Sequence, residues 1–282
     1  MSEFEALRPH LRAIAHRMLG SYADADDALQ ATWLRLTRAA PGEVDDPRAF
    51  STTVLSRVCL NMLRARRTRL DFAAREARLH ALTEPADPEH TLVAAHEVSG
   101  ALLVVLARLS PTERVAFVLH DLFAMPFEQV ADVLGRTVDA SKKLASRARV
   151  KVRGEPPANP VAHEAHRAVV TAFLHAARGG DIATLLTLLA PDVVRHADRE
   201  ALPEGVVTHL RGARDVADET RVFAAHAALA EVARVGGVPG LVVAPAGRLR
   251  LALCVRVQDA RIVEIDVMAR PERLASLAIA VL

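Results

Sequence analysis

The stretch F127-E-Q-V-A-D-V-L-G-R-T-V-D-A-S-K-K-L-A-S-R-A-R-V-K-V-R153 predicts a helix, a tight turn at Gly135 and a second, strongly basic helix. The only three lysines of the chain fall within the second helix, at Lys142, Lys143 and Lys151. A helix-turn-helix lays its second helix in a groove of DNA, where such side chains reach phosphates and base edges. On charge alone, a solvated helix face in an arginine-rich protein is an equal alternative.

The turn itself favours the helix-turn-helix. Ala131 is a small residue where the two helices would cross, and Gly135 tolerates the positive φ that the turn needs. Thr137 is the expected N-cap of the second helix, and the glycine and prolines from Gly154 onward end it. One position departs from the pattern, because Ser141 stands where a branched apolar residue normally packs.

A capping box lies upstream of this motif. In S110-P-T-E113 the serine can cap the helix that follows, the proline takes its first position, and Glu113 completes the reciprocal pair. The sequence therefore predicts a small helical domain over residues 92–153 with the basic helix last.

Composition limits the remaining possibilities. A chain of 282 residues with 51% hydrophobic and 4% aromatic residues can hold two or three domains. Residues 1–153 carry 22 basic and 19 acidic side chains, against 14 and 15 in residues 154–282, so the first half is the better candidate for nucleic acid. Cys59 and Cys254 lie far apart in apolar stretches, which favours a reduced, cytoplasmic protein over a disulfide or metal site. We expect no signal peptide and no membrane partner.

A second basic unit is predicted over residues 1–70. It reads as three helices, one ending at Gly20, one capped by Asp24, and one from Pro47 to Arg69. The last helix ends in a dense arginine cluster whose members must point outward because Leu60 and Leu63 anchor the other face. Such a cluster indicates contact with a polyanion more readily than compensation of the helix dipole.

Together the two basic units resemble an extracytoplasmic-function sigma factor of bacterial RNA polymerase. D24-A-D-D-A-L-Q-A-T-W-L-R35 is similar to region 2.2 of that family, and R48-A-F-S-T-T-V-L-S-R-V-C-L-N-M-L-R64 to regions 2.3 and 2.4. L109-S-P-T-E-R-V-A-F-V-L-H-D121 and L144-A-S-R-A-R149 are similar to region 4. The resemblance implies two partners, core RNA polymerase and promoter DNA. The first unit would bind the clamp helices of the largest polymerase subunit and open the −10 element, and the second would read the −35 element.

The resemblance also implies site residues. Asp27, Gln30 and Trp33 match polymerase-facing or supporting positions, although Trp33 fits a core role better than a contact surface. Ala31 stands where the family often has an acid, and Asn61 where it commonly has Asp. The implied DNA-binding residues are Asn61, Arg64, Arg66, Arg67, Lys142, Lys143, Ser146, Arg147 and Arg149.

Two linkers are predicted, at residues 71–91 and 154–160. Relatives with a fused C-terminal domain often carry a Trp-Leu-Pro motif in the first linker, of which this chain keeps Leu82 and Pro85. Residues 161–282 begin with helices and continue with period-two alternation through Leu249, Leu251, Leu253, Val255 and Val257. This order predicts an α+β domain. It resembles the SnoaL-like, ketosteroid-isomerase-like cone fold, and R270-P-E-R-L274 is similar to the ending of that domain in fused sigma factors.

Some cone-fold relatives are enzymes with an Asp or His general base in the cavity. The candidates here are His196, Asp198, His209 and Asp266, and no spacing among them demands catalysis. We therefore expect no enzyme, no cofactor and no metal site.

Three functions are compatible with these patterns. The first is a sigma factor whose C-terminal domain contacts the sigma domains within the chain and regulates them in cis, with an unknown small-molecule ligand left open. The second is a helix-turn-helix regulator that senses such a ligand and never binds polymerase. The third is an enzyme that uses the cavity. The Asp27 to Trp33 segment and the arginine cluster favour the first, since a simple regulator needs no second basic unit.

Overall fold

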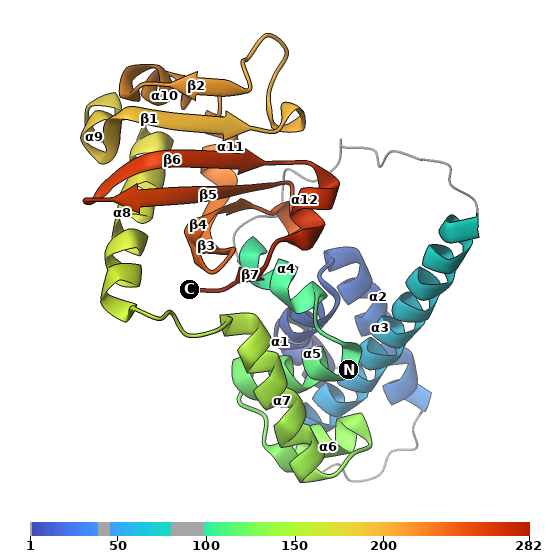
Figure 1. Cartoon of the computed structure of the whole chain (residues 1–282). Coiled ribbons are helices and arrows are strands. Elements are labelled where there is room, and N and C mark those ends of the chain that lie inside the picture. The colour runs from blue at the N-terminus through green and yellow to red at the C-terminus, as the bar shows by residue number, and fades with distance from the viewer. Residues whose placement is uncertain (1, 39–45, 80–98) are drawn as a thin grey trace. The chain divides into compact units, whose positions relative to one another are not determined.

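The computed structural model describes residues 2–38, 46–79 and 99–282, which divide into two compact units (Figure 1). The first unit comprises residues 1–91 and 106–149, and the second comprises residues 92–105 and 150–282. In the described ranges, no helix is both long and apolar enough to cross a membrane. The Trp-Leu-Pro counterpart at Leu82 and Pro85 lies outside the described residues.

The first unit is entirely helical in its described part. Its elements are α1 (Ser2–Leu19), α2 (Tyr22–Arg38), α3 (Pro47–Leu79), α5 (Pro111–Phe117), the π-helical turn η1 (Val118–Leu122) and α6 (Phe127–Leu134). Two further helices cross from one unit into the other, α4 (Gly100–Ala107) and α7 (Val138–Arg153). The capping box predicted at Ser110 and Glu113 is present at the start of α5.

Two details of the first three helices differ from expectation. The predicted cap of α2 at Asp24 is wrong, because the helix begins earlier and the Ser21 hydroxyl accepts the hydrogen bond from Asp24 N at 3.3 Å. The third helix continues past Arg69 to Leu79, so the beginning of the 71–91 segment is helical.

The core of the first unit lies between α1, α2 and α3. Leu11, Ile14 and Met18 of α1 and Leu55 of α3 are completely buried. Cys59 is buried with them, and burial raises the pKa of its thiol to about 12, so this cysteine is an inert core residue.

Helices of the two predicted sigma regions pack against each other within this unit. The buried guanidinium of Arg114 in α5 donates hydrogen bonds to Leu106 O at 2.6 Å and to Met18 O at 2.7 Å. Burial lowers the pKa of Arg114 to about 10, which still leaves it charged at neutral pH. Arg57 of α3 donates to Asp132 O of α6 at 3.0 Å. The helix-turn-helix therefore rests directly on α3.

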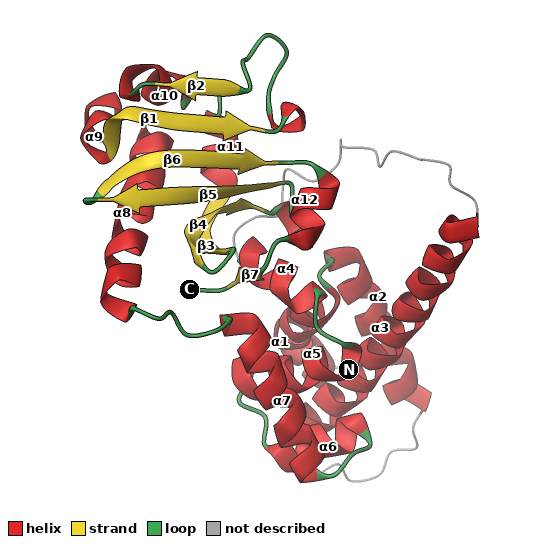
Figure 2. Ribbon diagram, viewed as in Figure 1, coloured by secondary structure: helices red, strands yellow, loops and turns green. Residues whose placement is uncertain are grey.

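The second unit is an α+β domain built on one mixed sheet (Figure 2). The strand order is β2-β1-β6-β5-β4-β3-β7, with every neighbouring pair antiparallel except β1 and β6. The strands are β1 (Leu189–Ala197), β2 (His209–Arg211), β3 (Ala230–Val235), β4 (Val238–Val243), β5 (Leu251–Gln258), β6 (Arg261–Met268) and β7 (Ile279–Ala280). The predicted turn between β5 and β6 is present, with positive φ at Asp259 and Ala260.

Helices cover one face of this sheet. They are α8 (Pro160–Gly179), α9 (Ile182–Leu188), α10 (Ala213–Glu219) and α11 (Ala224–Leu229), with α12 (Pro271–Ser276) after the last long strand. Short 3-10 turns lie at η2 (Arg199–Ala201) and η3 (Pro245–Gly247). The core forms where Val170 and Leu174 of α8 meet Leu241 and Val243 of β4. The predicted fold class is confirmed, with helical regions first and an α+β domain after them.

Candidate functional site

The helix-turn-helix has the local geometry that its sequence predicts. Gly135 takes the left-handed conformation at φ 63° and ψ 43°, and Thr137 Oγ1 accepts a hydrogen bond from Ala140 N at 3.2 Å. Ala131 is buried at the crossing. The unexpected Ser141 is completely buried, and its hydroxyl donates to Thr137 O at 3.1 Å. Because that hydroxyl has a partner on its own helix, the polar residue fits the core without an unpaired donor.

The basic face of α7 points away from this core. Ala145 and Ala148 are completely buried, while Lys142, Lys143, Ser146 and Arg147 are exposed. Arg149 differs from the other candidates, because its Nε donates to the Asp121 carboxylate of η1 and forms an ion pair with it. The structure thus brings four of the five α7 candidates onto one open surface.

The polymerase candidates lie on α2. Asp27 and Gln30 are exposed, and Leu34, one turn beyond Gln30, is 45% exposed. The neighbouring Asp26 is held in a two-pronged ion pair by Arg12, with both N–O distances at 2.8 Å. Trp33 is half-buried and packs on Phe4 with ring centroids 5.1 Å apart, which suits the supporting role expected of it. Leu34 was not among the predicted residues, although its helical spacing from Asp27 and Gln30 places it on the same face.

The arginine cluster forms a second exposed surface on α3. Asn61, Arg64, Arg66 and Arg67 are all exposed, and Leu60 and Leu63 are buried on the opposite face. The side-chain directions are those that the sequence predicts for this helix.

The four candidate general bases of the C-terminal domain do not form a catalytic cluster. Asp198 is 5% exposed and accepts hydrogen bonds from Ala269 N, Arg270 N and the guanidinium groups of Arg270 and Arg273. Although burial raises the pKa of its carboxyl, these hydrogen bonds lower it to about 2. A carboxylate of that strength is a poor proton acceptor at neutral pH.

The other three candidates have different surroundings. Asp266 is paired with Arg273 at 2.5 Å. His196 and His209 lie edge to face on neighbouring strands, with ring centroids 4.7 Å apart, and both are exposed. Both acids are bound by the R270-P-E-R-L274 segment after β6, in which Arg270 pairs with Asp198 and Arg273 pairs with Asp198 and Asp266.

One carboxylate of the C-terminal domain holds the start of α4. Glu231 of β3 accepts hydrogen bonds from Ser99 Oγ at 2.5 Å, from Gly100 N at 2.8 Å and from Ala101 N at 3.2 Å. Ser99 Oγ in turn accepts from Leu102 N. These backbone donors are unpaired at any helix start, and the positive end of the helix dipole favours an acid there.

The packing at this contact is close. A Cβ on Gly100 would lie 2.4 Å from Ala244 O, and one on Gly247 would lie 2.7 Å from Leu103 Cβ. Both positions therefore admit only glycine without a shift of the backbone or of Leu103.

The end of α7 is also bound within the second unit. Arg234 of β3 donates to Arg153 O at 3.1 Å and to Glu155 O, and Val281 N donates to Val152 O at 2.9 Å. The beginning of the predicted 154–160 linker is thus hydrogen-bonded to the sheet.

Two family models match the chain. Residues 4–69 match the family model for Sigma-70 region 2, and residues 99–152 match that for Sigma-70, region 4. The ECF RNA polymerase sigma factor SigJ of Mycobacterium tuberculosis is 42% identical over 223 residues, which cover 77% of this chain and 70% of SigJ. A probable ECF RNA polymerase sigma factor of the same species, SigI, is 34% identical over 278 residues, covering 97% of this chain and 94% of SigI. The crystal structure of Mycobacterium tuberculosis SigJ is 31% identical and covers 97% of this chain and 98% of its own, with a TM-score of 0.43.

The similarity to SigI extends through nearly the whole chain, and that to SigJ through about three quarters of it. By this likeness the chain belongs to the ECF RNA polymerase sigma factors.

Proposed function

We propose that this sigma factor binds core RNA polymerase through the exposed face of α2 and promoter DNA through two basic surfaces, on α3 and α7. The observation that carries the proposal is that, on each helix, the candidate binding residues and the core residues lie on different faces. On α2, α3 and α7 most side chains that match functional positions of the family are exposed, while residues such as Ala28, Leu63 and Ala148 on the same helices are buried. Such a factor acts in the cytoplasm, where the polymerase is located.

The polymerase surface consists of Asp27, Gln30 and Leu34. An unpaired carboxylate, an amide and an apolar side chain on successive turns form a small face that suits a basic helical partner. Trp33 supports this face from below through its contact with Phe4.

The DNA surfaces are assigned by charge and exposure. Arg64, Arg66 and Arg67 with Asn61 would serve the −10 element, and Lys142, Lys143, Ser146 and Arg147 the −35 element. We give Arg149 a positioning role instead, because the ion pair with Asp121 ties α7 to η1.

The packing of the first unit implies that the chain opens on the polymerase. Elements named −35 and −10 lie roughly 25 base pairs apart, which is about 85 Å of duplex at about 3.4 Å per base pair. Arg57 and Asp132 hold α3 and α6 in direct contact. Helices in contact cannot serve two DNA elements so far apart, so this contact must break during initiation.

We further propose that the C-terminal domain regulates the sigma regions in cis. The observation that supports this is the capping of α4, the first helix of the region 4 match, by Glu231 of the sheet. A displacement of β3 would then change the hydrogen bonds that Glu231 accepts at the start of region 4.

The polymerase proposal is tested by charge reversal. Asp27→Arg should weaken binding to core RNA polymerase at least about tenfold in a pull-down, a loss of about 1.4 kcal/mol. Glu5→Arg makes the same charge change on the exposed surface of α1 and should leave binding intact. Helicity, measured by circular dichroism, should be unchanged in both variants.

A protein that does not bind core polymerase would instead support the second function, a helix-turn-helix regulator. If the unaltered protein ignores core polymerase yet binds promoter duplex tightly by itself, the chain acts as a ligand-sensing helix-turn-helix regulator.

A further inference from the structure

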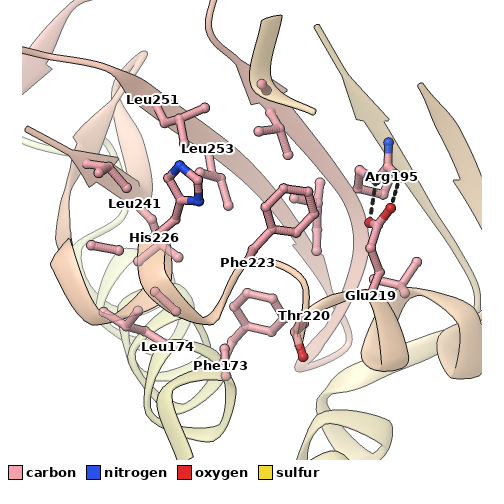
Figure 3. A pocket seen from close by; sticks show the side chains of 18 of the residues that line it. Phe173, Leu174, Arg195, Glu219, Thr220, Phe223, His226, Leu241, Leu251 and Leu253 are labelled. Atoms are coloured by element: carbon pink, nitrogen blue, oxygen red, sulfur yellow. Dashed lines mark hydrogen bonds and ion pairs between the residues drawn. The ribbon is translucent and has the colours of Figure 1, made fainter. Parts of the chain in front are cut away.

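A pocket lies inside the C-terminal domain, between the sheet and the helices that cover it (Figure 3). Its floor consists of alternate residues of β4, β5 and β6, which share one face because side chains in a strand alternate. Its roof comes from α8, α10 and α11 and from the turn between the last two. The rings of Phe173, Phe223 and His226 border the same space in Figure 3.

The pocket is too large to be a packing defect. Its volume is about 100 Å³, counted as space open to the centres of water-sized molecules. About 10–15 Å³ on that measure holds one water, and protein interiors are otherwise close-packed. Water is poorly suited to fill it, because the walls are almost entirely hydrocarbon. An apolar space of this kind is dry or holds an apolar guest.

We infer that the entrance lies beside α11, because His226 of this helix is the one exposed residue among those that line the pocket. This helix has no buried residue, and His226 is exposed although its ring borders the pocket. Phe223, in the turn before the helix, is half-buried. A guest can therefore enter past a short element that is weakly packed on the domain.

One polar pair is built into the far wall. The Arg195 side chain is 3% exposed and that of Glu219 is 12% exposed, and two hydrogen bonds join the guanidinium to the carboxylate. Arg195 also donates to Val207 O at 2.9 Å. The pair is neutral as a unit, and its arginine is already occupied by the acid and a backbone carbonyl.

This pair decides the charge of the guest. A carboxylate or phosphate would have to displace Glu219 to reach Arg195, and a cation would have to displace Arg195 to reach Glu219. Either exchange leaves a buried charge unpaired, which is strongly unfavourable. A hydroxyl can instead donate to a Glu219 oxygen, which has lone pairs to spare, without disturbing the ion pair.

We propose that this pocket is a binding site for an uncharged, largely hydrocarbon molecule of one or two rings, carrying at most a hydroxyl that points toward Glu219. The site takes a ligand and performs no reaction on it, because the acid in its wall is held by Arg195. The proposal goes beyond the sigma function and does not depend on it.

The probe for the test is 1-naphthol, with 1-naphthoate as its charged counterpart on the same ring system. Calorimetric titration of the full chain at neutral pH should give one 1-naphthol site with a dissociation constant of roughly 100 µM or tighter. The binding of 1-naphthoate should be at least about tenfold weaker.

Two variants fill the pocket. Val243→Phe adds a ring at the floor, and Ala227→Leu adds bulk at the less buried α11 side, where misfolding is a smaller risk. Each should weaken 1-naphthol binding at least about tenfold, while Val161→Phe, at an 80% exposed position of α8, should not change it. Circular dichroism must show the unaltered fold in every variant used.

The outcomes are decisive in both directions. Tight binding of 1-naphthol that both filling variants abolish supports the site and its location. The proposal is overturned if 1-naphthol fails to bind, if 1-naphthoate binds as tightly, or if a folded filling variant binds like the original chain.

Discussion

Asp198 illustrates how surroundings decide the role of a single side chain. The sequence makes it a candidate general base. In the fold, its two oxygens receive two backbone N–H groups and two arginines, Arg270 and Arg273. Those partners arrive from some seventy residues further along the chain. The sequence around Asp198 gives no sign of these distant partners. Asp198 could therefore be singled out from the sequence, but its structural role could not be predicted.

The first prediction concerns this carboxylate. Its pKa falls from 3.8 to about 2 on folding, so its contribution to stability is complete above about pH 4 and is lost as the pH falls to about 2. The shift corresponds to about 2 kcal/mol. Asp198→Asn should therefore destabilise the C-terminal domain by about 2 kcal/mol at pH 7, and the difference from the original chain should shrink below pH 4.

Urea unfolding of the full chain can measure this effect. Trp33 is the only tryptophan, so its fluorescence reports on the first unit, whereas far-UV circular dichroism reports on both. Only the circular dichroism transition should shift to lower urea in Asp198→Asn. Asp192→Asn, at an exposed position of β1, the strand that precedes Asp198, is the control. A variant as stable as the original chain would mean that Asp198 is not the anchor of α12.

At the scale of elements, local sequence signals predicted most of what the structure contains. The capping box at Ser110, the turn at Gly135 and the alternation in β5 each fix geometry within a few residues, and each is present. The strand is shorter than predicted, because β5 begins at Leu251 and Leu249 precedes it. The sequence predicts an end of the third helix at Arg69, whereas α3 continues to Leu79. Where a helix ends depends on the tertiary contacts that stabilise its last turns, and local sequence does not specify these contacts.

The basic face of α7 can be tested by single substitutions. Lys143 is exposed and proposed to contact promoter DNA, so Lys143→Ala should weaken binding of the polymerase complex to a promoter that depends on the −35 element. If the contact is to a phosphate, the slope of log affinity against log salt should fall by about 1. If it is to a base, sequence preference should change instead. Both can be measured by titrating duplexes at several salt concentrations.

The matched control is Arg167→Ala, which removes one positive charge from the exposed surface of α8. It should leave promoter affinity and salt slope unchanged. Normal affinity in Lys143→Ala, and likewise in single alanine variants of Lys142 and Arg147, would exclude α7 as a reader of DNA.

For the whole molecule, the proposed regulation depends on Glu231. Glu231→Gln keeps one acceptor oxygen but removes the charge at the start of α4, which should cost about 1 kcal/mol. Hydrogen exchange of the amides at the start of α4 should then speed up about fivefold. Transcription from one promoter should also change, rising if the contact restrains the sigma regions and falling if it pre-organises them.

Glu264→Gln is the control for this experiment, because Glu264 forms an ion pair with Arg256 at the surface of the same sheet. It should alter neither exchange at α4 nor transcription. Faster exchange with unchanged transcription in Glu231→Gln would remove the regulatory role while leaving the sigma function in place.

The contact between Arg57 and Asp132 has a consequence for competition in the cell. If that contact must break on polymerase, part of the intrinsic affinity is spent on opening, and the apparent affinity falls by the fraction of chains already open. A sigma factor of this kind binds only a small fraction of a limited pool of core polymerase while competing sigma factors are abundant. Its share grows once something else lowers the cost of opening. The strength of this hydrogen bond between α3 and α6 would then help to set the threshold at which a whole set of genes is switched on.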